Sequence, residues 1–82
     1  MYYVYLLQSR ETRTFYIGCT QNLEERIKQH NLGKVRSTKN KRPLNLVCAE
    51  EFYNKREAYR REKELKTKYT EKRKLLARIG LA

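Results

Sequence analysis

Tyr2-Tyr3-Val4-Tyr5-Leu6-Leu7 is an unbroken apolar and aromatic run near the start of the chain, and Thr14-Phe15-Tyr16-Ile17-Gly18-Cys19 follows after a short polar segment. The first run is rich in β-forming residues and has no polar face, which is typical of a strand covered on both sides. The second run alternates as a half-buried strand does, and residues 8–13 suffice to close an antiparallel hairpin between the two. These stretches predict a hairpin whose first strand is the central strand of a small sheet.

Helix signals follow the hairpin. Asn22 and Glu25 have the spacing of a capping box, apolar residues then recur with a helical period, and Gly33 suits the position just after a helix. A first helix is therefore predicted over 23–32. The same capping signal predicts a second helix from residue 55 to about 69. A last short helix is expected from about Thr70 until Gly80.

Pro43 divides the chain between the first two helices. Residues 34–42, the basic segment, contain no acid and are predicted to form a basic loop. Residues 44–53 predict a third strand, because Leu44, Leu46, Cys48 and Phe52 share a parity. The pair Glu50-Glu51 interrupts this pattern and indicates a bulge or an exposed edge. The predicted order is ββαβαα, an α/β (α+β) fold with a three-stranded antiparallel sheet flanked by helices.

Composition narrows the class of partner. The 82 residues suffice for one domain, 1–82, and at this size only about 60–65% of the surface of the unfolded chain can be buried. Lys and Arg number 20 against nine acids, and the net charge of +11 favours a phosphate-bearing partner, nucleic acid ahead of a membrane surface. No apolar run is long enough to span a bilayer and no signal segment is evident, so we expect a cytoplasmic monomer.

The metal and redox chemistry open to the chain is narrow. Cys19 and Cys48 are the only cysteines and lack CxxC spacing, so we expect both to be reduced. With a single histidine, the chain cannot build a zinc site of the usual kind. All nine acids are glutamates, so any hard cation must be bound by a glutamate.

Glu62 is the most unusual residue of the second predicted helix. Ala58, Tyr59, Leu65 and Tyr69 define the apolar stripe of that helix, and Glu62 falls in the middle of it. An ionised carboxylate in such a place needs a partner. Either Glu62 forms an ion pair with Arg26 or a nearby lysine, or it binds Mg²⁺ together with water and a substrate phosphate.

Four other side chains are candidates for phosphate chemistry. Arg26 lies at the margin of an apolar helix face, where it either packs its stem on the core or binds a phosphate with two hydrogen bonds. His30, four residues on, is either a packing residue or a catalyst. Tyr5 and Tyr16 lie on adjacent strands and either pack or act as phenol bases, which nearby cations would favour. Gly18 indicates that a ligand or another backbone comes close to this strand.

The arrangement of these residues resembles the GIY-YIG endonuclease family. Tyr3-Val4-Tyr5 stands in place of the first motif, with tyrosine instead of glycine, and Tyr16-Ile17-Gly18 matches the second motif. Arg26 follows Tyr16 by ten residues, like the family's arginine, and His30 falls where the family has a His or Tyr. Ala58-Tyr59-Arg60-Arg61-Glu62 looks like the helical segment that ends in the family's metal-binding glutamate. The likeness covers nearly the whole chain and is to the small, single-domain bacterial type.

This resemblance implies a divalent-metal-dependent endonuclease that hydrolyses DNA, with RNA as the alternative polymer. By analogy, Tyr5 would take a proton from the attacking water with His30 or Tyr16 as a relay, Arg26 would hold the phosphate, and Glu62 would bind one Mg²⁺ or Mn²⁺. The remaining nucleic-acid contacts are expected from exposed cations and from the strand glycine: Gly18, Lys34, Arg36, Lys39, Lys41, Arg42, Arg60 and Lys66. Such contacts give affinity for phosphates but little reading of bases. Alternatively, these charges are only a solvated face.

Two other hypotheses account for the charge. The first is a non-catalytic module that binds DNA or RNA, which would show salt-sensitive binding without turnover. The second, a protein that lies on anionic membranes, is weaker because neither predicted helix joins a large apolar face to its charge. Metal-dependent cleavage that Glu62→Ala abolishes would separate the endonuclease from both.

Overall fold

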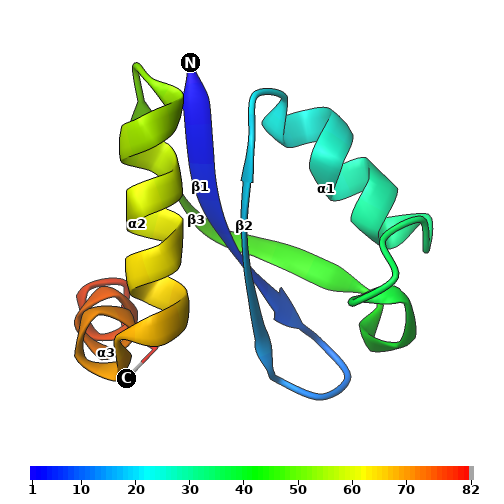
Figure 1. Ribbon diagram of the computed structural model, residues 1–82. Coiled ribbons are helices and arrows are strands. Elements are labelled where there is room, and N and C mark those ends of the chain that lie inside the picture. The colour runs from blue at the N-terminus through cyan, green and yellow to red at the C-terminus, as the bar shows by residue number, and fades with distance from the viewer. Residues whose placement is uncertain (82) are drawn as a thin grey trace.

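The computed structural model, which describes residues 1–81, places a twisted antiparallel sheet between helices (Figure 1). The strands are β1 (Tyr2–Ser9), β2 (Phe15–Thr20) and β3 (Leu44–Phe52), in the order β2-β1-β3. The helices are α1 (Leu23–Asn31), α2 (Lys55–Thr67) and α3 (Tyr69–Arg78), with a short 3-10 turn, η1 (Lys39–Lys41). The predicted ββαβαα order, the α+β class and the central position of β1 are confirmed.

Alternation along β1 divides the core between the two faces of the sheet. Val4 and Leu6 face α2 and α3, where they pack in one cluster with Ile17, Ala58, Leu65 and Leu75. Tyr5 and Leu7 point to the other face and pack with Leu44 and with Leu23 and Ile27 of α1. Because helices cover both faces, β1 needs no polar face, and this is why its sequence reads as a continuous apolar run.

Both predicted helix caps are present. The side chain of Asn22 accepts a hydrogen bond from the backbone N–H of Glu25 at 3.1 Å, and that of Asn54 accepts one from the N–H of Glu57 at 2.8 Å. Gly33 follows α1 with a φ of +80°, a left-handed conformation that glycine adopts without strain. The starts of α1 and α2 and the end of α1 therefore follow from local sequence.

Strand β3 differs from its predicted pattern because of a bulge. Adjacent residues of β1 pair with Cys48 and Leu46, so Val47 is the extra residue between them. The extra residue reverses the alternation: Leu44 and Leu46 lie on the α1 face, whereas Cys48 and Phe52 lie on the α2 face. The predicted common face of these four residues is therefore wrong. The bulge also precedes the acidic pair of this edge strand instead of coinciding with it.

The basic segment is folded, although it was predicted as a plain loop. It contains η1, and its residues Val35 and Thr38 are buried. Ser9 of β1 donates a hydrogen bond from Oγ to the carbonyl oxygen of Lys41 at 2.7 Å. The side chain of Asn31 bonds both the N–H and the carbonyl of Leu44, at 2.8 and 3.0 Å. The first contact ties the end of the basic segment to the sheet, and the second joins the residues that flank the segment, Asn31 of α1 and Leu44 of β3.

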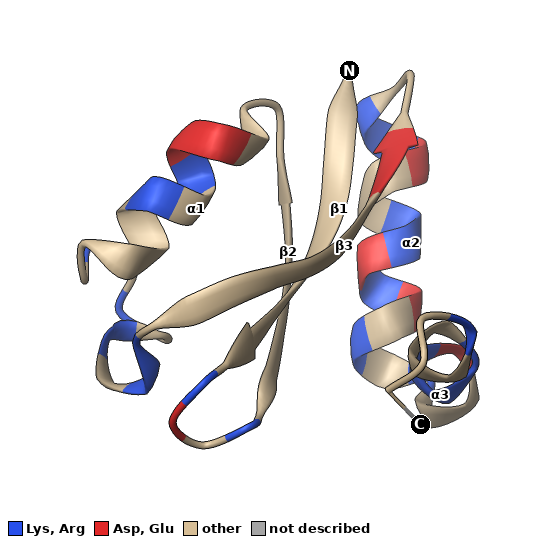
Figure 2. Ribbon diagram, turned by 180° about the vertical axis from the view of Figure 1, so that it is seen from behind, with Lys and Arg blue, Asp and Glu red and all other residues tan. Residues whose placement is uncertain are grey.

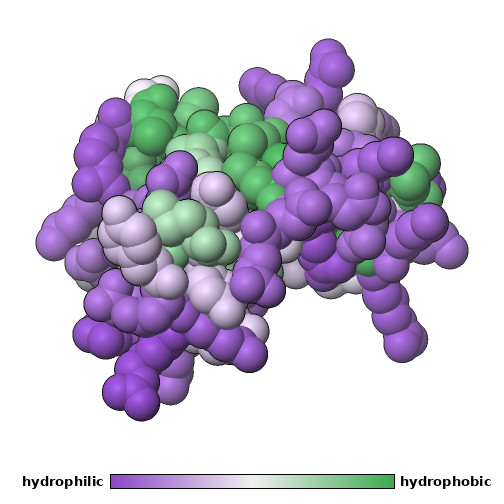
Figure 3. Space-filling model, turned by 90° about the horizontal axis from the view of Figure 1, so that it is seen from above, coloured by the Kyte–Doolittle hydropathy of each residue, from purple (hydrophilic) through white to green (hydrophobic). Residues whose placement is uncertain are grey.

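The surface is largely polar. Seen from above, hydrophobic side chains gather mainly in one band toward the back of the molecule, and the rest of this face is mostly hydrophilic (Figure 3). Over the described residues, each helix is too short and too polar to cross a membrane. Cys19 and Cys48 are free thiols on two strands that β1 separates, which agrees with the prediction that both are reduced.

Candidate active site

Three aromatic rings meet between the sheet and α1. Tyr5 of β1 and Tyr16 of β2 have ring centroids 6.3 Å apart, and the ring of His30 lies 5.8 Å from the first and 4.9 Å from the second. Tyr5 Oη and His30 Nε2 are hydrogen-bonded at 2.9 Å. His30 is fully buried and Tyr5 is 1% exposed. The register that brings Tyr5 and Tyr16 onto one face, which sequence leaves open, is provided by the pairing of β1 with β2.

Gly18 makes room for the phenol of Tyr5. The two residues pair across β1 and β2, and the Tyr5 ring lies over the glycine so closely that an added Cβ would clash with Oη and Cζ. The close approach predicted at this strand glycine is therefore present. The group that comes close is Tyr5, and Gly18 is itself buried, so this glycine has a structural role. Its role as a nucleic-acid contact stays a prediction.

Burial shifts the pKa values of Tyr5 and His30 in opposite directions. Loss of solvent raises the pKa of Tyr5 to about 12, and the neighbouring Arg26 guanidinium only partly offsets this. Burial also lowers the pKa of His30 to about 4, with a further contribution from the charge of Arg26. The expectation that nearby cations make a phenolate favourable is therefore wrong for Tyr5, because desolvation outweighs the cation. Both groups are neutral near pH 7.

Arg26 stands beside the aromatic rings at the open side of the site. Its guanidinium donates from Nη1 to Gln29 Oε1 at 3.1 Å, and its charge lowers the pKa of both Tyr5 and His30. Within residues 1–81, no carboxylate forms an ion pair with it. The predicted Arg26–Glu62 pair is thus not formed, and the half-buried guanidinium keeps donors for an anion such as a phosphate.

Glu62 lies at the edge of the sheet and not in the middle of an apolar stripe. Tyr59 and Tyr69, which were predicted to belong to that stripe, are 50% and 71% exposed. α2 packs through Ala58 and Leu65, and the side chain of Glu62, 22% exposed, lies at the margin. The stripe is narrower than predicted because α2 ends at Thr67, so Tyr69 belongs to α3, and because Tyr59 is half exposed.

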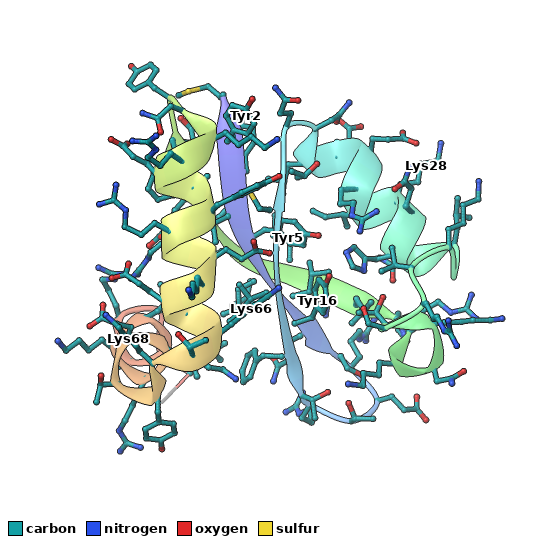
Figure 4. All side chains as sticks on the ribbon, viewed as in Figure 1. Tyr2, Tyr5, Tyr16, Lys28, Lys66 and Lys68 are labelled. Carbon is teal, nitrogen blue, oxygen red and sulfur yellow. The ribbon has the colours of Figure 1, made fainter. Side chains whose placement is uncertain are left out.

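The carboxylate of Glu62 is close to residues on both faces of the sheet. Burial raises the pKa of Cys19, which packs on the α2 face, and that of Tyr5, which packs on the α1 face, and the charge of Glu62 adds to both shifts. Cys19 belongs to the edge strand β2 and Tyr5 pairs with Gly18 of the same strand, so Glu62 lies near the free edge of β2. Figure 4 agrees: Tyr5 and Tyr16 lie between α1 and α2, and Lys66 approaches them from α2. Lys66 Nζ is 3.1 Å from Glu62 Oε2. Of the two predicted partners of Glu62, Arg26 or a nearby lysine, the lysine is therefore the one that forms the ion pair.

The donor set at this edge matches a cation that keeps water ligands. Among the described residues, no three His, Cys or Glu side chains are grouped to enclose an ion. Glu62 is a single, partly exposed carboxylate, and Mg²⁺ is commonly bound by one or two carboxylates together with substrate phosphate and water. A full protein cage, such as Zn²⁺ or Ca²⁺ takes, is not available. The residues therefore fit Mg²⁺ or Mn²⁺ bound jointly with a substrate.

Exposed cations flank this edge on both sides (Figure 2). On the α1 side they belong to the basic segment, and all of them are solvent-exposed: Lys34, Arg36, Lys39, Lys41 and Arg42. Arg42 also has a structural contact, since its Nε donates to the carbonyl of Lys39 at 2.8 Å. On the α2 side, Lys66 is exposed beside Glu62, whereas Arg60 is exposed on the β3 side of the helix, in a hollow that Phe52 also lines.

One buried polar residue of the site, Thr38, is not among the residues predicted from the sequence. Thr38, inside the basic segment, is fully buried, and its Oγ1 lies 2.7 Å from Nδ1 of His30. A threonine among lysines carries no periodic or motif signal, and the contact joins residues from two elements. The packing of the basic segment against α1 is what reveals it.

The sequence matches the GIY-YIG catalytic domain family over residues 1–75. A UPF0213 protein of Clostridium perfringens is 46% identical over 76 residues, which cover 92% of this chain and 80% of the relative. A UPF0213 protein of Staphylococcus haemolyticus is also 46% identical, over 67 residues that cover 80% of each chain. The solution NMR structure of a UPF0213 protein from Bacillus halodurans has a TM-score of 0.58 and 34% identity and covers 98% of this chain and 86% of that chain.

Proposed function

Because this chain belongs to the GIY-YIG catalytic domain family, a family of endonucleases, we propose that it is a divalent-metal-dependent endonuclease that hydrolyses phosphodiester bonds in DNA. The family membership implies a nucleic-acid substrate. One observation supports the finer proposal: Tyr5 is hydrogen-bonded to His30, and the charges of Arg26 from α1 and Glu62 from α2 both act on Tyr5. Hydrolysis of a phosphodiester needs a base, positive charge on the phosphoryl oxygens and stabilisation of the leaving oxygen.

Tyr5 is the proposed base for the attacking water. With a pKa of about 12 it is a neutral phenol near pH 7, so its oxygen can take a proton only as its own proton leaves. The group that can receive this proton is His30, whose Nε2 is 2.9 Å from Oη and whose lowered pKa keeps it neutral. This hydrogen bond favours His30 over Tyr16 as the relay. Tyr16 packs on both rings and holds them in place.

Arg26 and Glu62 complete the proposed site. The planar guanidinium of Arg26 would bind two oxygens of the scissile phosphate and hold it in line with the attacking water. Glu62 would bind the divalent cation. Its ion pair with Lys66 would open for this, and the Lys66 ammonium would then contact the substrate. When bound, Mg²⁺ or Mn²⁺ would supply positive charge at the oxygen where negative charge develops.

The exposed cations on either side of the β2 edge would hold the rest of the polymer. The basic segment and the exposed face of α2 both present lysines and arginines to solvent, and the net charge of +11 supports binding by release of counterions. Such contacts orient the backbone and read few bases. We therefore expect weak sequence preference, with single-stranded or branched DNA as the substrates to test first.

The test is a substrate panel. Purified protein with Mg²⁺ or Mn²⁺ would be given single-stranded, duplex and branched DNA and the same sequences as RNA. Glu62→Gln and Arg26→Ala should abolish cleavage. Glu64→Gln is the matched control on α2, since Glu64 pairs with Lys68 away from the site, and Lys28→Ala is the control on α1, since Lys28 points away from the tyrosines (Figure 4). Cleavage that survives Glu62→Gln would contradict the proposed metal ligand.

The net charge and the Glu62–Lys66 ion pair also suit the second candidate, a non-catalytic binding module. Such a module would bind DNA or RNA with an affinity that falls steeply with salt, and Mg²⁺ would enter only as a competing counterion. Salt-sensitive binding to every polymer with no cleavage in any metal would support it and reject the endonuclease.

A further inference from the structure

The buried hydroxyl of Thr38 contacts His30 on the side of the ring opposite to Tyr5. Nδ1 of His30 is 2.7 Å from Thr38 Oγ1, and Nε2 is 2.9 Å from Tyr5 Oη. Thr38 and His30 are both fully buried, and Tyr5 is 1% exposed. Each ring nitrogen therefore has one protein partner and no access to water. Since a neutral imidazole has one N–H donor and one acceptor nitrogen, one contact uses the donor and the other uses the acceptor.

The Val35 carbonyl, at the end of the Tyr5–His30–Thr38 chain of hydrogen bonds, indicates which atom donates in each bond. Thr38 Oγ1 lies 3.5 Å from the carbonyl oxygen of Val35, which can only accept. If the Thr38 hydroxyl donates to that carbonyl, Oγ1 accepts from Nδ1–H, and Nε2 is left to accept from the Tyr5 hydroxyl. In this direction every buried proton has an acceptor. Among residues 1–81, all buried side-chain nitrogen and oxygen atoms have a hydrogen-bond partner, as this arrangement requires.

If donors and acceptors were reversed along this chain, the buried hydroxyl proton of Tyr5 would have no acceptor. If Thr38 donated to Nδ1, Nε2–H would donate to Tyr5, and the hydroxyl proton of Tyr5 would need a further acceptor. Among residues 1–81, Tyr5 Oη has no hydrogen-bond acceptor besides His30: the guanidinium of Arg26 carries donors only, and Tyr16 and Glu62 act on Tyr5 through charge, without a hydrogen bond to it. A buried donor without an acceptor is rare and costs free energy. The geometry thus favours a proton on Nδ1.

We propose that Thr38 is a positioning residue, which holds His30 in the Nδ1–H tautomer and keeps the Nε2 lone pair directed at the hydroxyl of Tyr5. The catalytic consequence rests on the proposed function. A water proton moves to Tyr5 Oη while the Tyr5 proton moves to His30 Nε2, and Nδ1–H stays hydrogen-bonded to Thr38. The water oxygen forms its bond to phosphorus, the bond from phosphorus to the leaving oxygen breaks, and the leaving oxygen keeps the electron pair. His30 then returns its proton to Tyr5, which passes one proton to solvent.

This role connects the substrate-binding surface to the relay. Thr38 belongs to the basic segment, between exposed cations proposed to hold the polymer, and the backbone N–H of Thr38 bonds the carbonyl of the buried Val35 at 3.1 Å. The same short turn therefore presents cations outward and a hydroxyl inward. A shift of the turn away from α1 would separate Oγ1 from Nδ1 and remove the preference for one tautomer.

The experiment compares Thr38→Val, which keeps the shape and loses the hydroxyl, with Thr38→Ser, which keeps the hydroxyl. Two-dimensional ¹H–¹⁵N spectra of the single imidazole report which ring nitrogen carries the proton. We expect it on Nδ1 in the unaltered chain and in Thr38→Ser, and on Nε2 in Thr38→Val, because valine cannot accept from Nδ1–H. The kcat of DNA cleavage should fall roughly 10- to 100-fold in Thr38→Val with KM unchanged. Thr38→Ser should restore it.

A proton on Nε2 in the unaltered chain would overturn the proposal, and this measurement needs no variant, so it decides even where Thr38→Val does not fold. Equal tautomers and equal rates in Thr38→Val and the unaltered chain would overturn it as well. The tautomer is measured without substrate. A chain that cleaves no nucleic acid but has its proton on Nδ1 would therefore reject the proposed function and leave the assignment of Thr38 as the tautomer-setting residue supported.

Discussion

Burial of the only histidine predicts a loss of stability as the pH falls from 7 to 5. The pKa of His30 is about 4 in the folded protein, against an ordinary value of 6.5 in the unfolded chain. Between these two values the unfolded state binds the extra proton, so stability is present above about pH 6.5 and is lost as the pH falls toward 4. Applied to one site, linkage gives a decrease in the free energy of unfolding of about 2 kcal/mol between pH 7 and pH 5.

Few other groups titrate in this window. A glutamate in an unfolded chain has a pKa of about 4.3, below this window, and Lys74 lowers the pKa of Glu71 in the folded protein. Urea unfolding followed by far-ultraviolet circular dichroism suits the measurement, because the chain contains no tryptophan for fluorescence. A plot of the free energy of unfolding against pH should slope upward from pH 5 to about 6.5 and then level off.

The control is His30→Gln, which should be less stable at pH 7 and should lose most of this slope. In parallel, the ring signals of His30 should stay those of a neutral imidazole at pH 5. A free energy of unfolding that is flat from pH 7 to 5, or a ring that titrates near 6.5, would refute the argument that burial holds this histidine neutral.

Two further substitutions test the packing around the site. Gly18→Ala should lower the free energy of unfolding by about 1–3 kcal/mol, because the added methyl group must displace a Tyr5 ring that is hydrogen-bonded in place, and an unchanged urea midpoint would contradict this reading. Asn31→Ala should cost about 1–3 kcal/mol through loss of both bonds to the backbone of Leu44, whereas Asn31→Asp, which keeps only the acceptor, should fall between it and the unaltered chain in the same titration.

Much of the fold could be predicted because its signals are local. The capping asparagines and the glycine after α1 act on backbone groups within a few residues, so they mark helix ends without reference to the rest of the chain. The continuous apolar run of β1 and the alternation of β2 reflect how many sheet faces are buried. The motif Tyr16-Ile17-Gly18 and the spacing to Arg26 likewise needed only the order of residues.

Other features depended on contacts that sequence does not record. A single extra residue, Val47, moved half of β3 to the other face, and no local pattern marks its place. The apolar stripe predicted for α2 is too wide because Tyr59 fits a helical apolar pattern yet is 50% exposed. Nearby cations were expected to lower the pKa of Tyr5, but its pKa is raised. Burial is the larger effect, and the extent of burial is a property of the packed core.

The amino-acid sequence by itself determined the strands and helices of this protein, its positive charge and the residue types available for phosphate chemistry, since each of these depends on neighbours along the chain. Tertiary structure alone decided that the charge of Glu62 on α2 acts on Tyr5 of β1, that Tyr5 fills the space over Gly18, and that Thr38 bonds the inner nitrogen of His30. These three arrangements join residues from separate elements. Strand register, helix packing and desolvation arise only when the whole chain is folded.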